Sequence, residues 1–289
     1  MNAKKLGTGR GLLAAFWLLG GLLLAFIVLP LLRMVTHQDP ETFWQVAGAP
    51  DVRAAIGLSL AAALITSLIA AVVGTPLAYL LARGNFPGKS VLAALVDLPL
   101  AIPHTVVGIA LLFVFGRNGW LGAPLARLGL HFWGTTSGIV VGMLFVSAPF
   151  MVNAARGGFE GVDERLEKVA RTLGATPREV FRRISLPLAL RGIFTGMVLT
   201  YARSISEFGA VVILAYYPQT APVKIYELYL EYGLTRSSAM AVLLMGVSLS
   251  TFVLLRYLAG QATAGGPSRP GSDAAGSWSQ GAPKKAVRP

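Results

Sequence analysis

Residues 156–187 read RGGFEGVDERLEKVARTLGATPREVFRRISLP and lie between two long apolar segments of the chain. Asp163 and Glu164 favour the start of a helix, because acidic side chains stabilise the positive N-terminal end of a helix. Apolar residues then recur at helical spacing as far as Leu173, and Gly174 is typical of a helix end. The first half of this loop is therefore predicted to be a short helix.

The second half of the loop predicts another short helix. Thr176, Pro177 and Glu179 combine a capping hydroxyl, a proline at the first helical position and a glutamate three residues after the cap. We expect this helix to end before Pro187, because proline restricts the conformation of the residue that precedes it. The whole loop should form a rigid bracket of two helices.

The sequence around the bracket is that of a membrane protein. Only 13% of the residues are charged, whereas a soluble domain carries about 25%. A helix needs about 20 apolar residues to cross the hydrocarbon core of a bilayer. Six stretches meet this condition, namely 12–35, 56–82, 91–115, 137–155, 188–215 and 239–259. We expect an all-α, polytopic membrane protein with six transmembrane helices.

The first apolar stretch, 12–35, follows three basic residues and could be a signal peptide. It is longer than the apolar region of a signal peptide, and no small-residue cleavage pattern follows it. We interpret it as a retained first span.

The basic residues predict the orientation of the spans. Most of the 25 Lys and Arg residues lie before residue 12, in the loops 83–90 and 156–187, and after residue 255. Positive charge gathers on the cytoplasmic side of membrane proteins, so the bracket and both termini should be cytoplasmic in a multi-pass protein of the cell membrane.

The chain should divide into three parts. Residues 1–11 form a cytoplasmic N-terminus, and residues 12–260 form the transmembrane domain that carries the bracket. Residues 261–289 are rich in Gly, Pro, Ser and Ala, a composition that cannot offset the entropy lost on ordering. They predict a disordered cytoplasmic tail.

Other classes of function lack the residues that they need. The net charge of +12 lies in loops and at the ends of the chain, so it does not predict nucleic-acid binding. The absence of cysteine and the wide separation of His37, His104 and His131 argue against thiol chemistry and metal sites. Gly84–Ser90 resembles a phosphate-binding loop, but only three residues separate its glycines where four are required. We interpret it as a turn and expect no ATP site in this chain.

The bracket resembles the EAA loop of the inner-membrane permeases of ATP-binding-cassette (ABC) importers. That signature reads Glu-Ala-Ala, three residues, Gly, nine residues and Ile-x-Leu-Pro. The spacing and identity of its second half match Gly174, Ile184, Leu186 and Pro187. The Glu-Ala-Ala positions hold Lys168, Val169 and Ala170, and Glu167 beside them is a candidate substitute for the missing glutamate.

The resemblance implies a type I ABC importer permease fold. In that family the loop is the coupling helix that seats in a groove of a cytoplasmic ATPase. ATP and Mg would be bound by two partner ATPase subunits, with no cofactor held by this chain.

Two further segments, 97–108 and 202–234, resemble the permeases for molybdate and tungstate. This resemblance implies a homodimer that works by alternating access with the two ATPase subunits and with an extracytoplasmic oxyanion-binding protein. Sulfate and thiosulfate permeases are relatives and form the alternative.

A candidate translocation pathway lies in the third and fifth spans. Pro99 and Pro103 interrupt the third span, which is tolerated at membrane depth only where the segment is buried in protein or lines a cavity. Arg203 and Glu207 lie four residues apart in the fifth span and must face the protein interior. The candidate residues are Pro103, His104, Thr105, Arg203, Ser204, Ser206 and Glu207.

Two interpretations of the charged pair remain open. Arg203 could attract a passing dianion, or Arg203 and Glu207 could neutralise one another as a structural link, and we favour the link because intramembrane charges usually pair. Asp97 is expected to cap the broken third helix or to pair with an arginine.

Two other classes of membrane protein fit less well. A membrane-embedded hydrolase would need a nucleophile with a base or a metal cluster. A channel or secondary transporter would not need the bracket and would more often show inverted repeats, which the sequence does not display.

Overall fold

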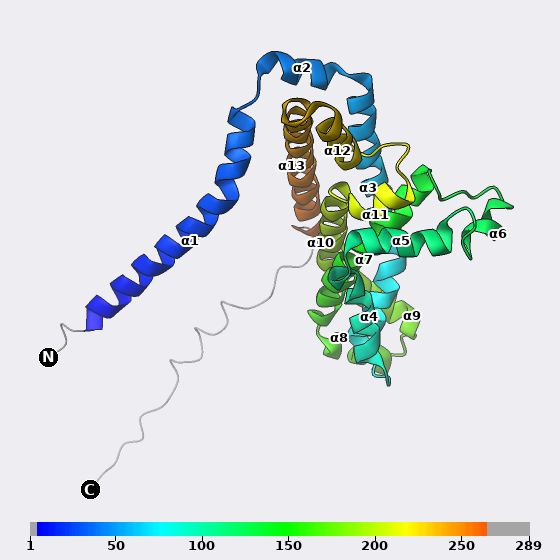
Figure 1. Cartoon of the computed structure of the whole chain (residues 1–289). Coiled ribbons are helices and arrows are strands. Elements are labelled where there is room, and N and C mark those ends of the chain that lie inside the picture. Colours follow the sequence, from blue (N-terminus) through cyan, green and yellow to red (C-terminus); the bar gives the residue numbers. More distant parts are fainter. Residues whose placement is uncertain (1–4, 265–289) are drawn as a thin grey trace, which may run out of the picture.

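The computed structural model describes residues 5–264, and the described chain is built of helices joined by short loops (Figure 1). This confirms the all-α class. The helices are α1 (Lys5–Thr36), α2 (Pro40–Gly48), α3 (Pro50–Arg83), α4 (Lys89–Ala101), α5 (His104–Phe115), α6 (Gly122–Ala126), α7 (Thr136–Glu160), α8 (Glu164–Thr172), α9 (Pro177–Val180), a π-helical turn (Phe181–Ser185), α10 (Leu186–Ile205), α11 (Gly209–Leu214), α12 (Ala221–Tyr232) and α13 (Leu234–Ala264).

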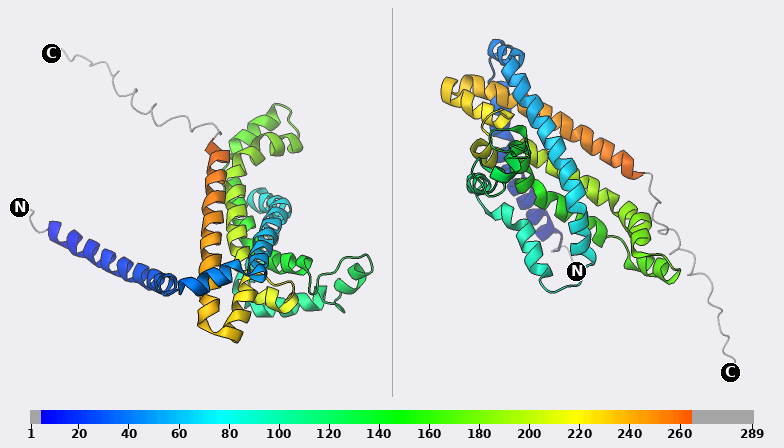
Figure 2. Two further views of the ribbon diagram at one scale, coloured as in Figure 1. Left: turned by 90° about the horizontal axis from the view of Figure 1, so that it is seen from above. Right: turned by 90° about the vertical axis from the view of Figure 1, so that its right-hand side faces the viewer.

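The centre of the molecule is a bundle of α3, α7 and α10 (Figures 1 and 2). A Cβ atom on Gly158 of α7 would lie 2.9 Å from the Cα of Gly192 in α10. Small residues allow the backbones of membrane helices to approach closely. The two glycines therefore set the contact between α7 and α10.

Within the described residues 5–264, five helical segments are long and apolar enough to cross a membrane. They are α1, α3, α7, the continuous helix Pro177–Ile205 and α13. The remaining predicted span is the pair α4 and α5, which is bent by 113°. The structure thus contains six apolar segments, but the third is a sharply broken one.

The predicted fifth span, 188–215, is wrong in its second half. α10 ends at Ile205, and a separate short helix, α11, follows after Ser206–Phe208. The chain restarts as a helix because Glu207 accepts a hydrogen bond from the N–H of Ala210, at 2.9 Å. Hydropathy alone records an apolar run and does not report its change of direction.

The ends of the described chain extend past the predicted boundaries. α1 begins at Lys5, within the predicted cytoplasmic segment 1–11, and α13 continues to Ala264. Residues 261–264 of the predicted disordered tail are therefore helical. The rest of that prediction, from residue 265, lies outside the described residues.

α2 and α12 lie at one end of the bundle, and the bracket lies at the other (Figure 1). Lys224 of α12 contacts Asp51 of α3 at 2.9 Å and Glu227 at 2.6 Å. Burial alone would lower the pKa of Lys224, but its hydrogen bonds to Glu227 and Asp51 raise it above the ordinary value. The charged lysine thus links α12 to α3.

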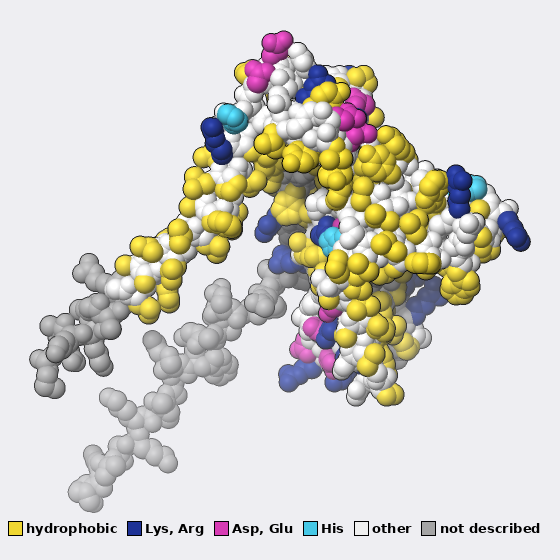
Figure 3. All heavy atoms as spheres, viewed as in Figure 1, with side chains coloured by type: hydrophobic (Ala, Val, Ile, Leu, Met, Phe, Trp, Pro, Cys, Tyr) yellow, Lys and Arg dark blue, Asp and Glu magenta, His cyan; other side chains and the backbone are white. Residues whose placement is uncertain are grey.

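Hydrophobic side chains cover much of the visible surface along the bundle, and many acidic side chains gather at its two ends (Figure 3). Such a distribution suits a protein whose flanks face lipid, because apolar flanks need no hydrogen-bonding solvent.

Candidate functional site

The first helix of the bracket, α8, forms as predicted. The carboxylate of Asp163 accepts a hydrogen bond from the N–H of Arg165 at 2.9 Å. At the other end, Gly174 has a φ of 89°, and the N–H of Ala175 donates to the carbonyl of Ala170 at 3.0 Å. Only a glycine adopts this conformation without strain, so Gly174 sets the angle between the two halves of the bracket.

The second helix of the bracket begins as predicted. The side chain of Thr176 accepts from the N–H of Glu179 at 3.3 Å, and Glu179 accepts from the N–H of Thr176 at 2.9 Å. These two bonds form a reciprocal capping box.

The prediction that this helix ends before Pro187 is wrong. The chain passes from α9 through the π-helical turn into α10, and the N–H of Leu186 bonds to the carbonyl of Phe181. Pro187 lies in the first turn of α10. The wider π turn relieves the clash that a proline ring makes with the preceding helical turn. The bracket is therefore continuous with a membrane helix and can transmit movement to it.

Glu167 anchors the bracket internally. Its side chain is buried and accepts hydrogen bonds from Arg83 Nε at 3.0 Å and from Ser185 Oγ at 2.9 Å. Arg83 also donates to the carbonyl of Val162 at 2.7 Å. The proposed substitute for the signature glutamate thus faces the interior, where it ties α8 to the end of α3.

The outer side of α8 carries an apolar surface. Leu166, Val169 and Leu173 are 50%, 58% and 83% exposed. Lys168 of the same helix pairs with Glu164 at 3.1 Å. A group of large exposed apolar residues on a charged loop indicates a contact surface for another protein. We call these three apolar residues the bracket face.

The other residues of the signature lie where the bracket joins the membrane helix. Ile184 and Leu186 are half-buried, and Pro187 is exposed.

Three of the pathway candidates meet at the breaks of the two interrupted helices. Arg203 Nη2 lies 2.9 Å from Glu207 Oε2 and 2.9 Å from His104 Nδ1. His104 Nδ1 is 3.3 Å from the same carboxylate. Glu207 is 1% exposed. This geometry favours the structural link between Arg203 and Glu207, with His104 as a third member. We call the three residues the roof triad.

The other candidates differ in their positions. Ser206 is exposed and lies 3.3 Å from Arg203 Nη1. Pro103 and Thr105 are exposed beside His104. Ser204 is buried and bonds to Ser147 of α7 at 3.1 Å, so it points away from the triad.

Asp97 does not have the predicted partner. Its Oδ1 accepts a hydrogen bond from Asn153 Nδ2 of α7 at 2.7 Å, so it neither pairs with an arginine nor caps the broken helix. An amide satisfies the carboxylate without a second charge. The sequence separates these residues by 56 positions and contains no signal for the pairing.

Two glycines that sequence reasoning missed hold α5 against α11. A Cβ on Gly209 would lie 2.7 Å from the Cβ of His104, and a Cβ on Gly108 would lie 2.7 Å from that of Ile213. The two short helices can therefore pack only with glycine at these points. We call α5, α11 and the breaks before them the roof.

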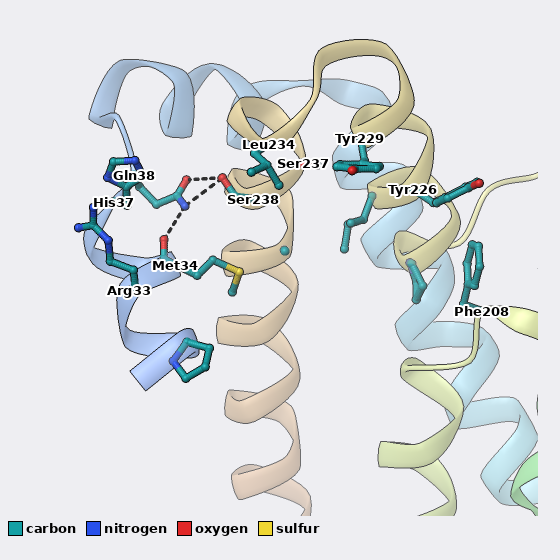
Figure 4. A pocket seen from close by; sticks show the side chains of 14 residues that line it. Arg33, Met34, His37, Gln38, Phe208, Tyr226, Tyr229, Leu234, Ser237 and Ser238 are labelled. Atoms are coloured by element: carbon teal, nitrogen blue, oxygen red, sulfur yellow. Dashed lines mark hydrogen bonds between the residues drawn. The ribbon is translucent and has the colours of Figure 1, made fainter. Parts of the chain in front are cut away.

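A cleft of about 690 Å³ separates α1 from α12 and α13 (Figure 4). Apolar side chains from all three helices line it, and Gln38 donates to Ser238 Oγ at 3.2 Å on one side. No motif in the sequence indicated this cleft, because it depends on how α1 stands apart from the bundle (Figure 2).

Comparisons with known proteins agree with this architecture. The chain is 47% identical over 251 residues to the molybdate/tungstate transport system permease protein of Thermococcus kodakarensis, which covers 86% of this chain and 96% of that protein. It is 34% identical to the probable sulfate transport system permease protein of Chlorokybus atmophyticus, over 77% of this chain and 80% of that protein.

Solved structures show the same fold at low sequence identity. A bacterial alginate ABC transporter in complex with an alginate pentasaccharide-bound periplasmic protein matches with a TM-score of 0.68 and 17% identity, over 88% of this chain and 98% of that chain. The inward-facing MetNI methionine ABC transporter matches with a TM-score of 0.57 and 15% identity, over 78% and 98% of the two chains.

The family model for binding-protein-dependent transport system inner membrane components matches residues 74–262. This range holds the bracket, both broken helices and nearly all of α13. The chain therefore belongs to the family of inner membrane components of binding-protein-dependent transport systems.

Proposed function

We propose that this protein is the permease subunit of an ABC importer for molybdate and tungstate. One observation carries the choice of substrate. Four relatives named as molybdate/tungstate permeases are 42–47% identical and are covered over 90–96% of their length. Relatives named as sulfate permeases are 32–34% identical.

The bracket supports the partnership with an ATPase. Members of the family work with an ATPase subunit and a substrate-binding protein. In our proposal, two ATPase subunits bind ATP and Mg, and each receives the bracket face of one permease subunit. This chain holds no cofactor, and the residues that couple it to the ATPase are Gly174, the bracket face and the buried anchor Glu167.

The cleft supports a homodimer. α1 stands apart from the bundle, and none of its apolar window is buried within the chain. We propose that a second copy fills the cleft between α1, α12 and α13 with its own apolar helices. Closure of the ATPase pair would then draw two brackets together and tilt α10 in both copies.

The orientation follows from the same arrangement. We place the bracket and both termini in the cytoplasm and the roof toward the outside, where an extracytoplasmic binding protein delivers the oxyanion. Alternating access then consists of opening the roof while the brackets close. Because the bracket continues directly into α10, which ends at the roof, one rigid element connects the two events.

The test is ATP hydrolysis by the reconstituted complex. The permease and its ATPase subunits are placed in liposomes, and binding protein is added empty or loaded with tungstate, molybdate or sulfate. We expect stimulation by the tungstate and molybdate forms alone. Stimulation by sulfate only would keep the importer and overturn its substrate, and an assembled complex that none of them stimulates would contradict the proposal.

A further inference from the structure

The roof triad is the charged cluster that a passing anion would meet, and this inference rests on the proposed function. The side chains of Arg203 and His104 are 20% and 37% exposed. Exposed Thr105 and Ser206 lie beside them. The cluster therefore opens to one side of the roof, where the two broken helices meet.

The positive charge of Arg203 is already balanced. Among the described residues, its ion-pair partner is Glu207, and both oxygens of that carboxylate are in use. Oε2 accepts from Arg203, and Oε1 accepts from the N–H of Ala210 at the start of α11, at 2.9 Å. Glu207 is thus a buried anion held in one position.

An unbalanced guanidinium at this point would obstruct transport. Charges attract far more strongly in a poorly solvated site than in water, and a permeation path must bind its ion weakly enough to release it. A dianion would stay at a free Arg203. With Glu207 in place, the arginine still offers N–H donors, but the cluster carries no net charge when His104 is neutral.

We propose that Glu207 keeps the affinity of the pathway for oxyanions low by neutralising Arg203 where the two broken helices meet. In this role Glu207 is a positioning and tuning residue that acts through Arg203. A purely structural role, as a cap of α11, would need the carboxylate oxygen but not its charge.

Glu207→Gln separates the two roles. The amide oxygen can still accept from the N–H of Ala210, and the side chain has nearly the same shape. The charge is lost, so Arg203 is left unbalanced. We expect the variant to bind tungstate at least about tenfold more tightly than the wild type, and to take it up more slowly at saturating substrate.

The measurement uses the assembled complex of permease and ATPase subunits in lipid nanodiscs, without binding protein. Equilibrium dialysis with radioactive tungstate gives the affinity of the wild type, of Glu207→Gln and of the double variant Arg203→Gln/Glu207→Gln. The increase in tungstate affinity should vanish in the double variant. It should also become smaller as the salt concentration is raised, since salt screens charges. Unchanged affinity in a folded Glu207→Gln variant would overturn the proposal, even if uptake fell.

Ser206→Lys provides a second variant in case Glu207→Gln fails to assemble. It adds positive charge at an exposed position of the same cluster, and we expect the same tighter binding and slower uptake. A folded Ser206→Lys variant with wild-type affinity would also contradict the proposal. Uptake by wild-type complex with loaded binding protein is measured in parallel, because absence of that uptake would refute the proposed function instead.

Discussion

The bracket and the roof each contain a buried glutamate held by an arginine, but the two pairs differ in their surroundings. Glu167 and Arg83 are closed in by Ser185 and the carbonyl of Val162. The roof triad instead opens to one side through its partly exposed histidine and arginine. The same kind of ion pair is therefore enclosed in one region and partly open in the other.

The difference has a physical basis. The side chains of Arg83 and Glu167 are only 12% and 7% exposed. Such a pair holds its helices in one arrangement, because any movement would leave a buried charge uncompensated. A pair with an exposed side can exchange a protein contact for water or an ion at less cost. The bracket is thus suited to transmitting a movement and the roof to opening.

The largest loss of stability should come from breaking the ion pair between Glu167 and Arg83. Glu167→Ala leaves Arg83 without its partner, and we expect the bracket to lose about 3–5 kcal/mol of stability against local opening. Hydrogen exchange of the amides in 163–187 measures this loss. Glu164→Gln removes an acid from the same helix whose pair with Lys168 is exposed, so it should change the exchange far less. Equal exchange in the two variants would show that the bracket is not held by its buried pair.

A smaller loss is expected when the bracket face is made polar. Leu173→Asp places a charge on the most exposed residue of that face, and we expect the affinity for the ATPase subunits to fall by about 2–4 kcal/mol. Titration of the ATPase onto the permease measures the change. The hydrogen exchange of the bracket should stay as in the wild type, and unaltered ATPase affinity would place the docking surface elsewhere.

Overpacking the roof tests whether it opens. Gly209→Ala forces a Cβ against His104 and should destabilise the closed roof by about 1–3 kcal/mol. ATP hydrolysis without binding protein should rise, because the open form becomes more populated. Gly157→Ala is the matched control, since no atom lies within 4 Å of its added Cβ. Equal hydrolysis by both variants would argue that the roof does not open.

The smallest energetic effect is expected from substituting Gly174, where the bracket bends. Gly174→Val strains a backbone with positive φ by about 1–2 kcal/mol, although no neighbour lies within 4 Å of the added Cβ. We expect less uptake for each ATP hydrolysed, with folding mostly intact. Gly174→Asn should retain more coupling, because asparagine tolerates this conformation. Normal coupling in the valine variant would show that the angle of the bracket is unimportant.

Much of the fold could be predicted because it depends on neighbours in the sequence. Apolar runs predicted the membrane helices. Asp163 and Glu164 predicted where the first helix of the bracket starts, and the cap Thr176 predicted the start of the second. The prediction that the second bracket helix ends before Pro187 was wrong. A proline usually restricts the residue before it, but here a π-helical turn accommodates the proline and joins the bracket to α10.

The candidate site was only partly accessible from sequence. Arg203 and Glu207 are four residues apart and would share one face of the predicted fifth span, so their pairing could be predicted from the sequence. The partnership of Glu167 with Arg83 joins positions 84 residues apart, and that of Arg203 with His104 joins positions 99 residues apart. Residues so far apart in the chain show no pattern in the sequence that would predict their contact.

The sequence by itself determined that the chain crosses a membrane and where its bracket begins, because hydropathy and helix capping act over a few residues. Only the tertiary structure decided how sharply the third span bends, that the fifth span is broken, that Glu167 faces inward and that glycines bring α5 onto α11. These features depend on contacts between distant segments, and such contacts exist only once the chain has folded.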